Sequence, residues 1–301
     1  MAKLFKKTKA PTGAQHQNGW SSITLSAARG TGKSVMYLAL GIWAVIQIFP
    51  LFWMFTFSLK DNQEIFFDNP IGLPNEWRWE NYDNVINNAN MPTYFLNSVI
   101  VTLATIAIVV VFGLMATYAL TRMTWRGRNI FRGYYIFGLA IPIHAALLPV
   151  FFILRDLNML NTHWALILPY SAFGLSMSIL IFSGFISAIP KELEESACLD
   201  GCSIYGIFFR IILPLMKPAI SVVAIFTFLQ CWNELLFAST YATDWRFRTL
   251  TVGIMEMSGQ FRTDWGPIGA GLSIATLPTL LFYVILSKRV QKSLVLGAVK
   301  G

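Results

Sequence analysis

The sequence predicts an all-α, polytopic membrane protein with six transmembrane helices, and three observations carry this prediction. Of the 301 residues, 55% are hydrophobic and only 13% are charged, whereas soluble domains carry about 25% charged residues. Uncharged stretches of about 20 residues, the length that crosses a bilayer, recur along the chain. Basic residues cluster beside alternate stretches, as membrane topology requires. Such a chain is too apolar to form a soluble core with a solvated surface.

The predicted elements follow from these apolar stretches. Residues 1–34 form a basic, polar N-terminal tail that lacks the apolar core of a signal peptide. Residues 35–287 form the membrane domain, and residues 288–301 form a C-terminal tail. Glu234 interrupts the fifth span. The six spans are predicted at residues 34–59, 95–121, 133–154, 164–189, 218–240 and 265–287.

The Lys and Arg residues predict the orientation of the spans. With the N-terminus inside, 17 of the 23 basic residues lie on the inner side and six on the outer side. Inner loops of membrane proteins are enriched in Lys and Arg, so both termini are expected in the cytoplasm. The outer loop of residues 60–92 is acidic and aromatic. It is interpreted either as a solvated loop with interfacial aromatics or as a landing surface for an extracellular partner.

Several function classes are not expected from the sequence. The net charge of +8 follows from topology and does not indicate a nucleic-acid partner. Residues 30–34 (GTGKS) resemble a phosphate-binding loop, but Ala27 stands where that motif needs glycine. Cys198, Cys202 and Cys231 give no disulfide framework, and no histidine accompanies them to bind metal. No catalytic residues, cofactor or metal are therefore expected.

A charged segment between two apolar spans, residues 190–218, is called the elbow here. It is predicted to form two short helices, the first stabilised by acidic residues near its N-terminus and ended by Gly201 in a left-handed conformation. The second helix has an apolar face at helical spacing, which predicts a docking surface for a partner. The members of this face are Ile204, Ile207, Phe208 and Ile211.

The elbow contains Glu195-Ser196-Ala197, then Gly201, and after nine intervening residues Ile211 with Leu213-Pro214, a spacing that resembles the EAA motif of ABC-importer permeases. Ser196 departs from the family, which usually has alanine there, but its hydroxyl is small enough to leave docking intact. The resemblance implies a type I permease fold whose cytoplasmic loop seats in a cleft of the ATPase subunit. The matching residues are Glu195, Ser196, Ala197, Gly201, Ile211, Leu213 and Pro214.

The resemblance also implies roles for individual elbow residues. Glu195 and Asp200 are expected to help fix the elbow on the ATPase, and Gly201 to allow its bend. Ile207, Phe208 and Leu213 are expected to bury against the partner or neighbouring spans. Closure of the ATPase would thereby reach the membrane helices.

Trp232, Asn233 and Glu234 form the second candidate site, for the translocation path or substrate. A carboxylate within a span is costly and by default marks a functional position. Aromatic stacking with polar hydrogen bonding suits a sugar, and the run resembles a feature of sugar permeases. The alternative is structural: a buried hydrogen bond between helices or a salt bridge to an outer-loop arginine.

The C-terminal region resembles carbohydrate ABC permeases of the maltose-importer type. The resemblance rests on residues 264–266 and 275–278, and on an ending that resembles tails lying against the ATPase pair. That ending is Gly297, Ala298, Val299, Lys300 and Gly301.

The resemblance implies one permease subunit of a bacterial ABC sugar importer in the inner membrane. Its implied partners are a second homologous permease subunit, an ATPase dimer at the cytoplasmic face, an extracytoplasmic sugar-binding protein, membrane lipid and the sugar. The chain itself would perform no chemistry and would alternate access as ATP is bound and hydrolysed. The alternatives are an ABC permease for a non-sugar solute and an ion-coupled secondary carrier, which often needs paired intramembrane ionisable groups.

Overall fold

The structure is a computed structural model that describes the backbone of residues 19–259 and 263–298 and the side chains of residues 33–259 and 263–285. All regular elements in these ranges are helical. The chain divides into two compact units, residues 1–53 and 54–301, which are considered separately. Most of the predicted N-terminal tail and the predicted ATPase-contacting residues 299–301 lie outside the described residues, as do the side chains of Gly297 and Ala298.

Helix α1, Gly19–Phe57, begins within the predicted polar tail rather than at residue 34. Its apolar part, Lys33–Phe57, matches the first predicted span. Residues 19–32, which precede the apolar part of the helix, include no proline that would interrupt its hydrogen bonds. Hydrophobicity located the span, but it could not locate the start of the helix.

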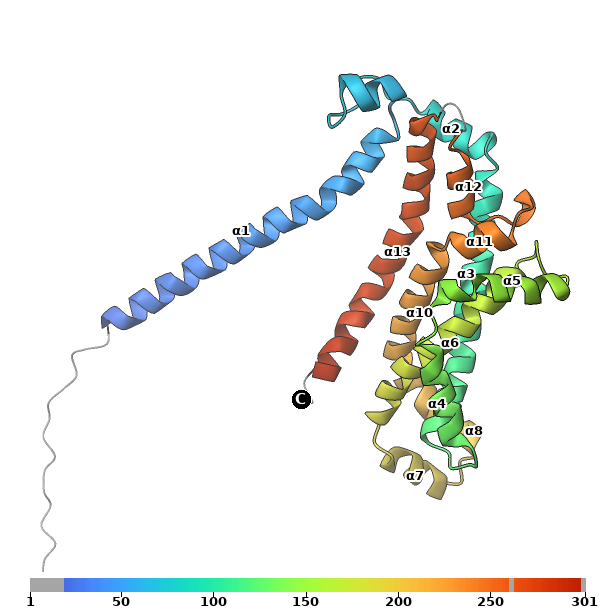
Figure 1. The fold of residues 1–301 in the computed structure, drawn as a ribbon. Coiled ribbons are helices and arrows are strands. Elements are labelled where there is room, and N and C mark those ends of the chain that lie inside the picture. Colours follow the sequence, from blue (N-terminus) through green and yellow to red (C-terminus); the bar gives the residue numbers. More distant parts are fainter. Residues whose placement is uncertain (1–18, 260–262, 299–301) are drawn as a thin grey trace, which may run out of the picture. The chain divides into compact units, whose positions relative to one another are not determined.

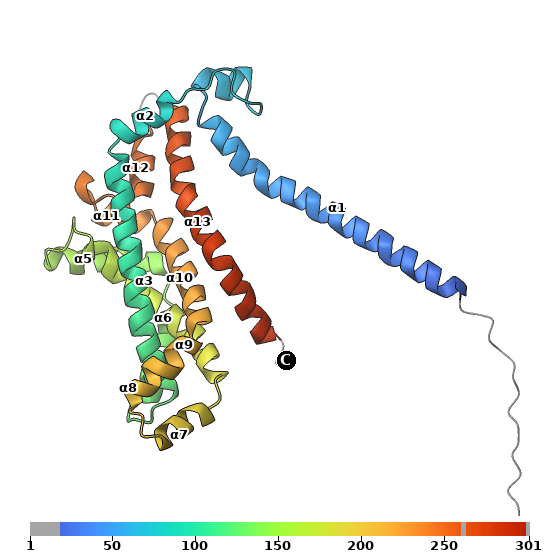
Figure 2. The ribbon, with the colours of Figure 1, turned by 180° about the vertical axis from the view of Figure 1, so that it is seen from behind.

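The second unit is built around long helices that run alongside one another (Figures 1 and 2). Helix α3 (Met91–Thr121) packs most extensively against α6 (Trp164–Ser187), and α10 (Lys217–Trp232) packs against both. Helix α13, Trp265–Ala298, lies against α10. With α1, the helices α3, α6 and α13 are the four described helices long and apolar enough to cross a membrane individually.

The third predicted span is broken. Helix α4, Arg128–Gly138, is followed by the 3-10 helix η2 (Ile143–Ala146) and α5 (Leu147–Asp156), with a bend of 97° between the two parts. Pro142 lies at the break, where a proline removes a helix hydrogen bond and disfavours helical geometry in the residue before it. The predicted continuous third span is therefore two helical parts that lie nearly at right angles.

The fifth predicted span is shorter than expected. Helix α10 ends at Trp232, and a separate short helix, α11, covers Leu236–Tyr241. At its other end α10 meets the second helix of the elbow with a bend of 71°. Counting each bent pair as one span gives up to six spans, in agreement with the predicted number.

Shorter helices close the two ends of the second unit. The elbow contains α7 (Glu192–Leu199), α8 (Ile204–Ile207), the π-helix η3 (Phe208–Ile212) and α9 (Leu213–Leu215). It lies at the lower end of the unit in Figure 1. The opposite end carries the π-helix η1, Glu64–Asp68, with α2 (Glu80–Asn87), the 3-10 helix η4 (Trp245–Phe247) and α12 (Leu250–Glu256).

Candidate coupling and translocation sites

The first helix of the elbow ends in a glycine-dependent cap. Gly201 has φ +80° and ends α7, as predicted. The backbone N–H of Cys202 donates to the carbonyl of Ala197 at 2.9 Å, the long-range bond of a Schellman motif. No heavy atom lies within 4 Å of where a Cβ at Gly201 would sit, so the requirement for glycine is conformational rather than steric.

The second helix starts at Ser203, whose side chain accepts a hydrogen bond from the backbone N–H of Gly206 at 3.2 Å. Ile207 and Phe208 are buried in the core cluster formed with the membrane helices, whereas Ile204 is exposed and Ile211 is half-buried. The four residues therefore do not form a single exposed docking face, because two of them pack within the chain itself. The π-helix η3 changes the number of residues per turn and rotates the face within this segment.

The residues that match the EAA motif divide by exposure. Ala197 is buried, Ile211 and Leu213 are half-buried, and the other residues of the pattern reach the surface. Ser196 donates its hydroxyl to the carbonyl of Glu192 at 2.8 Å, so the departure from alanine is accommodated within α7. The surface members of the pattern are Glu195, Ser196, Gly201 and Pro214, and Asp200, which lies outside the pattern, is exposed as well.

Three exposed apolar side chains on the elbow were not singled out from the sequence. Leu199 is 90% exposed, Tyr205 76% and Phe209 57%. Large apolar side chains gathered on an exposed surface mark interaction sites. Two of them, Tyr205 and Phe209, flank the buried Ile207 and Phe208 in the sequence. Hydrophobic periodicity alone does not say which of these residues is covered.

Glu234, in the second candidate site, occupies the break between α10 and α11. Its Oε1 accepts the backbone N–H of Phe237 at 2.9 Å, and its Oε2 accepts the backbone N–H of Ala238 at 3.0 Å. The hydroxyl of Tyr170 on α6 donates to Oε2 at 2.5 Å. A carboxylate at a helix N-terminus is stabilised by the helix dipole, so Glu234 caps α11 and ties it to α6.

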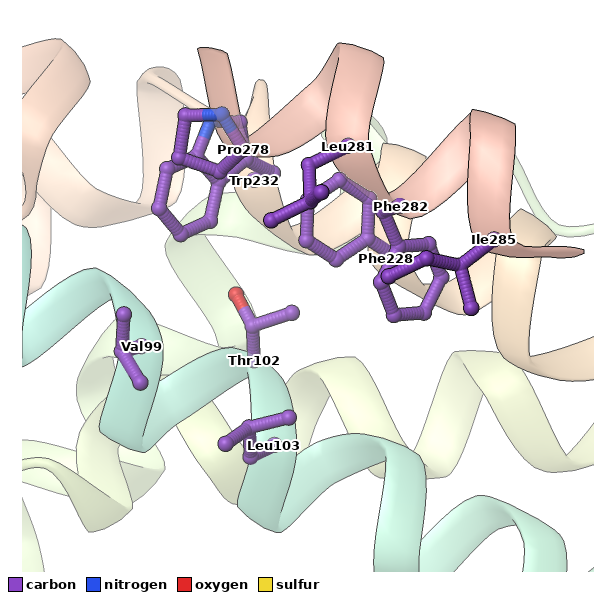
Figure 3. A pocket seen from close by; sticks show the side chains of 9 residues that line it. All are labelled: Val99, Thr102, Leu103, Phe228, Trp232, Pro278, Leu281, Phe282 and Ile285. Carbon is purple, nitrogen blue, oxygen red and sulfur yellow. The ribbon is translucent and has the colours of Figure 1, made fainter. Parts of the chain in front are cut away.

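Trp232 is 4% exposed, and its side chain is held from two sides. The indole N–H donates to the carbonyl of Ala275 at 3.0 Å, and the ring stacks on Phe228 with centroids 5.3 Å apart. The ring borders an apolar pocket of about 160 Å³ between α3, α10 and α13 (Figure 3). The pocket is lined by Val99, Thr102, Leu103, Phe228, Trp232, Pro278, Leu281, Phe282 and Ile285.

Asn233 is the exposed member of the Trp-Asn-Glu run. Its side-chain amide donates to the carbonyl of Leu229 at 2.9 Å. It lines a hollow of about 410 Å³ between α10, α12 and α13 that also contains three threonines. The full lining is Trp232, Asn233, Leu235, Thr251, Ile254, Met255, Leu272, Ala275, Thr276 and Thr279.

The structure therefore brings Trp232 and Asn233 to one hollow and turns the Glu234 carboxylate towards α11 and α6. Among the described residues, no group of three or more His, Cys, Asp or Glu side chains could hold a metal ion. Cys198, Cys202 and Cys231 are free thiols.

The apolar helices and broken spans define a multi-pass membrane protein. Residues 109–295 match the model of the family described as "Binding-protein-dependent transport system inner membrane component". The chain belongs to this family, and the predicted ABC-permease membership is confirmed. The chain is a transport subunit and not an enzyme.

Curated relatives cover most of the chain. A probable ABC transporter permease protein, YurM of Bacillus subtilis (strain 168), is 35% identical over 270 residues, which are 90% of this chain and 89% of the relative. The diacetylchitobiose uptake system permease protein NgcG of Streptomyces coelicolor (strain ATCC BAA-471 / A3(2) / M145) is 34% identical over 88% of both chains. The trehalose transport system permease protein SugB of Mycobacterium tuberculosis (strain CDC 1551 / Oshkosh) is 32% identical over 86% of this chain and 97% of the relative.

A solved structure shares the fold. It is a chain of a bacterial ABC transporter involved in the import of the acidic polysaccharide alginate, with a TM-score of 0.74 and 20% sequence identity. The match covers 93% of this chain and 99% of that chain. The predicted all-α ABC-importer permease fold is therefore confirmed.

Proposed function

We propose that this chain forms half of the translocation pathway of a bacterial ABC importer for carbohydrates. The observation that carries the carbohydrate class is the similarity to the NgcG and SugB permeases, whose names specify diacetylchitobiose and trehalose. The proposed substrate is a neutral sugar of disaccharide or oligosaccharide size. The proposed partners are a second homologous permease subunit, an ATPase dimer and an extracytoplasmic sugar-binding protein.

The elbow is proposed to be the surface that docks on the ATPase. Its exposed Leu199, Tyr205 and Phe209 would enter an apolar cleft, and Glu195 and Asp200 would contact basic groups at the rim. Ile207 and Phe208 face the membrane helices instead and connect the docked surface to them. ATP binding would close the ATPase dimer, and the elbow would carry that movement into the bilayer.

The hollow beside Asn233 is proposed to be part of the translocation path. The Asn233 amide and the hydroxyls of Thr251, Thr276 and Thr279 are uncharged hydrogen-bonding groups, which suit sugar hydroxyls. Trp232 would supply an aromatic edge. Glu234 would act indirectly: its hydrogen bonds stabilise the break between α10 and α11, which places Asn233 at the hollow.

The elbow is proposed to lie in the cytoplasm, with both termini. This orientation rests on the distribution of basic residues, 17 on the proposed inner side out of 23. The side of the membrane on which the ATPase would dock is then the same as the cytoplasmic side predicted from the Lys and Arg residues.

Gly201 offers a test of the docking role at a single position. In Gly201→Asn the left-handed conformation remains accessible, whereas Gly201→Val places a β-branched residue there at a cost of about 1–3 kcal/mol. In membrane vesicles containing the whole importer, uptake of labelled disaccharide should persist for Gly201→Asn and fall for Gly201→Val at equal protein level. Equal uptake by both variants would refute the docking role of this bend.

The same vesicles distinguish the proposed importer from the alternative transport classes. A secondary carrier would lose uptake when a proton uncoupler is added at constant ATP, whereas the proposed importer would keep it. Binding of amino acids or phosphate, rather than sugars, by the partner binding protein would replace the carbohydrate assignment with the non-sugar alternative.

A further inference from the structure

Arg122 and Glu194 form a nearly buried ion pair between a membrane helix and the elbow. Arg122 directly follows the last residue of α3, and Glu194 lies in the first turn of α7. Nε of Arg122 lies 2.8 Å from Oε1 of Glu194, and the two side chains are 9% and 14% exposed. Removing a charged pair from water is costly unless further hydrogen bonds satisfy it.

The guanidinium group of Arg122 also donates hydrogen bonds at the C-terminal end of a second membrane helix, α6. Nη2 donates to the carbonyl of Ile186, in the last turn of α6, at 2.9 Å and to that of Ile189, two residues after the end of α6, at 2.5 Å. The last carbonyls of a helix lack partners within the helix, and a positive charge there is favourable. One side chain therefore joins α3, α6 and α7.

Tyr118, one turn earlier on α3, connects the other helix of the elbow. Its hydroxyl donates to Oε2 of Glu194 at 3.2 Å. Its ring lies 5.3 Å from the ring of Phe208, centroid to centroid, in η3. Both arms of the elbow thus contact a single turn of α3.

The elbow is also connected to the next membrane helix, α10, directly through the chain, but this connection is bent. The second helix of the elbow meets α10 at a bend of 71°, and the break lies at Met216 between Pro214 and Pro218. A push along that helix is not aligned with α10. The ion pair offers a lateral route into α3 and α6, the two helices that pack most extensively on each other.

We propose that Tyr118, Arg122 and Glu194 form a latch that makes the elbow move as one body with the α3–α6 pair. The proposal rests on the proposed function, because it takes the exposed elbow surface as the point where the ATPase acts. The three residues are positioning residues that touch no substrate. Breaking the latch would leave the elbow able to dock but unable to pass its movement to the spans.

The first experiment removes the ion pair in the complete importer, reconstituted in lipid vesicles with its ATPase and binding protein. Glu194→Gln and Arg122→Gln should still co-purify with the ATPase and hydrolyse ATP, while sugar uptake falls at least about tenfold. Arg122→Lys should lie between, because lysine keeps the charge but lacks the planar fork that reaches three acceptors.

Glu192→Gln is the matched control. Glu192 is an exposed carboxylate in the same first turn of α7, so its loss removes the same helix-dipole interaction without breaking the latch. Uptake by this variant should remain near the wild-type level. Equal uptake by Glu194→Gln and Glu192→Gln would overturn the proposal.

The second experiment measures the latch itself in the same importer. Spin labels are placed on the native, exposed Cys198 of α7 and on Thr124→Cys, an exposed position just after α3, in a Cys202→Ser background. Pulsed electron paramagnetic resonance should give a narrow distance distribution in the otherwise wild-type chain and a broad one with Glu194→Gln. An unchanged narrow distribution in Glu194→Gln would overturn the latch even if uptake fell. Failure of the proposed function is distinguishable, because no ATPase would then co-purify with the wild-type chain.

Discussion

The role of a single side chain in this protein depends on which residues it contacts in the folded structure. Glu234 meets Tyr170, which is 64 positions away in the sequence, and caps a helix that begins two residues later. Asn233, its neighbour, is exposed at the hollow. The two residues are adjacent in the sequence, but one holds the chain break and the other is available to a ligand.

Removing the Glu234 carboxylate should mainly destabilise the protein. Glu234→Ala leaves the N–H groups of Phe237 and Ala238 and the Tyr170 hydroxyl without their acceptor, and an unsatisfied buried polar group costs about 1–3 kcal/mol. A lower midpoint of thermal unfolding in detergent is the expected result, with Glu234→Gln less affected because its amide oxygen still accepts. Asn233→Ala, in contrast, should lower uptake affinity with an unchanged midpoint; a normal midpoint for Glu234→Ala would contradict the capping role.

His163 should make stability depend on pH. Its Nε2 lies 2.8 Å from the Asn97 Oδ1, and burial lowers its pKa below the usual value near 6.5. As the pH falls below about 6.5, the unfolded chain takes up a proton before the folded chain does, so the free energy of unfolding decreases. At higher pH both states are neutral and the stabilisation is fully present.

Thermal unfolding between pH 7.5 and 5 would measure this effect. His163→Gln should flatten the pH dependence, because glutamine does not titrate in this range. A pH dependence that persists in His163→Gln would assign it to another group.

At the scale of elements, glycines and breaks decide how closely the helices approach. A Cβ at Gly266, near the start of α13, would lie 2.4 Å from the backbone carbonyl oxygen of Lys60 and 2.5 Å from Nδ2 of Asn81. Gly266 therefore allows α13 to approach the chain that follows α1 and the start of α2 closely. Lys60 itself is buried, and its Nζ donates to the carbonyls of Asn69 and Gly72 at 2.5 and 2.7 Å.

Substitution at Gly266 should therefore be costly. Gly266→Ala must displace backbone and should destabilise the protein by about 1–3 kcal/mol, because overpacking forces backbone shifts. Gly184→Ala on α6 is the matched control, since nothing lies within 4 Å of its Cβ position. It should be neutral or slightly stabilising. Equal unfolding midpoints for the two variants, measured in the same detergent, would show that the chain around Gly266 accommodates a methyl group without loss of stability.

At the scale of the whole molecule, the protein is proposed to place its elbow on the cytoplasmic side of the membrane. Its native cysteines offer a test of the proposed orientation without added tags. Cys198 is exposed on the elbow and Cys231 is buried in α10.

A membrane-impermeant maleimide should distinguish the two faces. In a Cys202→Ser variant, inside-out vesicles should be labelled at Cys198 and right-side-out vesicles should remain unlabelled, while Cys231 stays unlabelled in both. The partner ATPase should slow labelling of Cys198 if it covers the elbow. Labelling of Cys198 from the outer face would place the elbow outside and end the coupling proposal.

The sequence by itself determined the composition of a membrane protein, up to six spans, the elbow and its left-handed glycine, and the family. These features depend on residues close together in the chain, so periodicity, charge and motif spacing are sufficient to predict them. The tertiary structure alone decided that Glu234 caps α11, that Arg122 meets Glu194, that the third span turns by 97°, and that Leu199 and Tyr205 face outwards. These features depend on partners distant in sequence and on the register shift of η3. Burial and hydrogen-bond satisfaction are properties of the packed fold, and local pattern does not contain them.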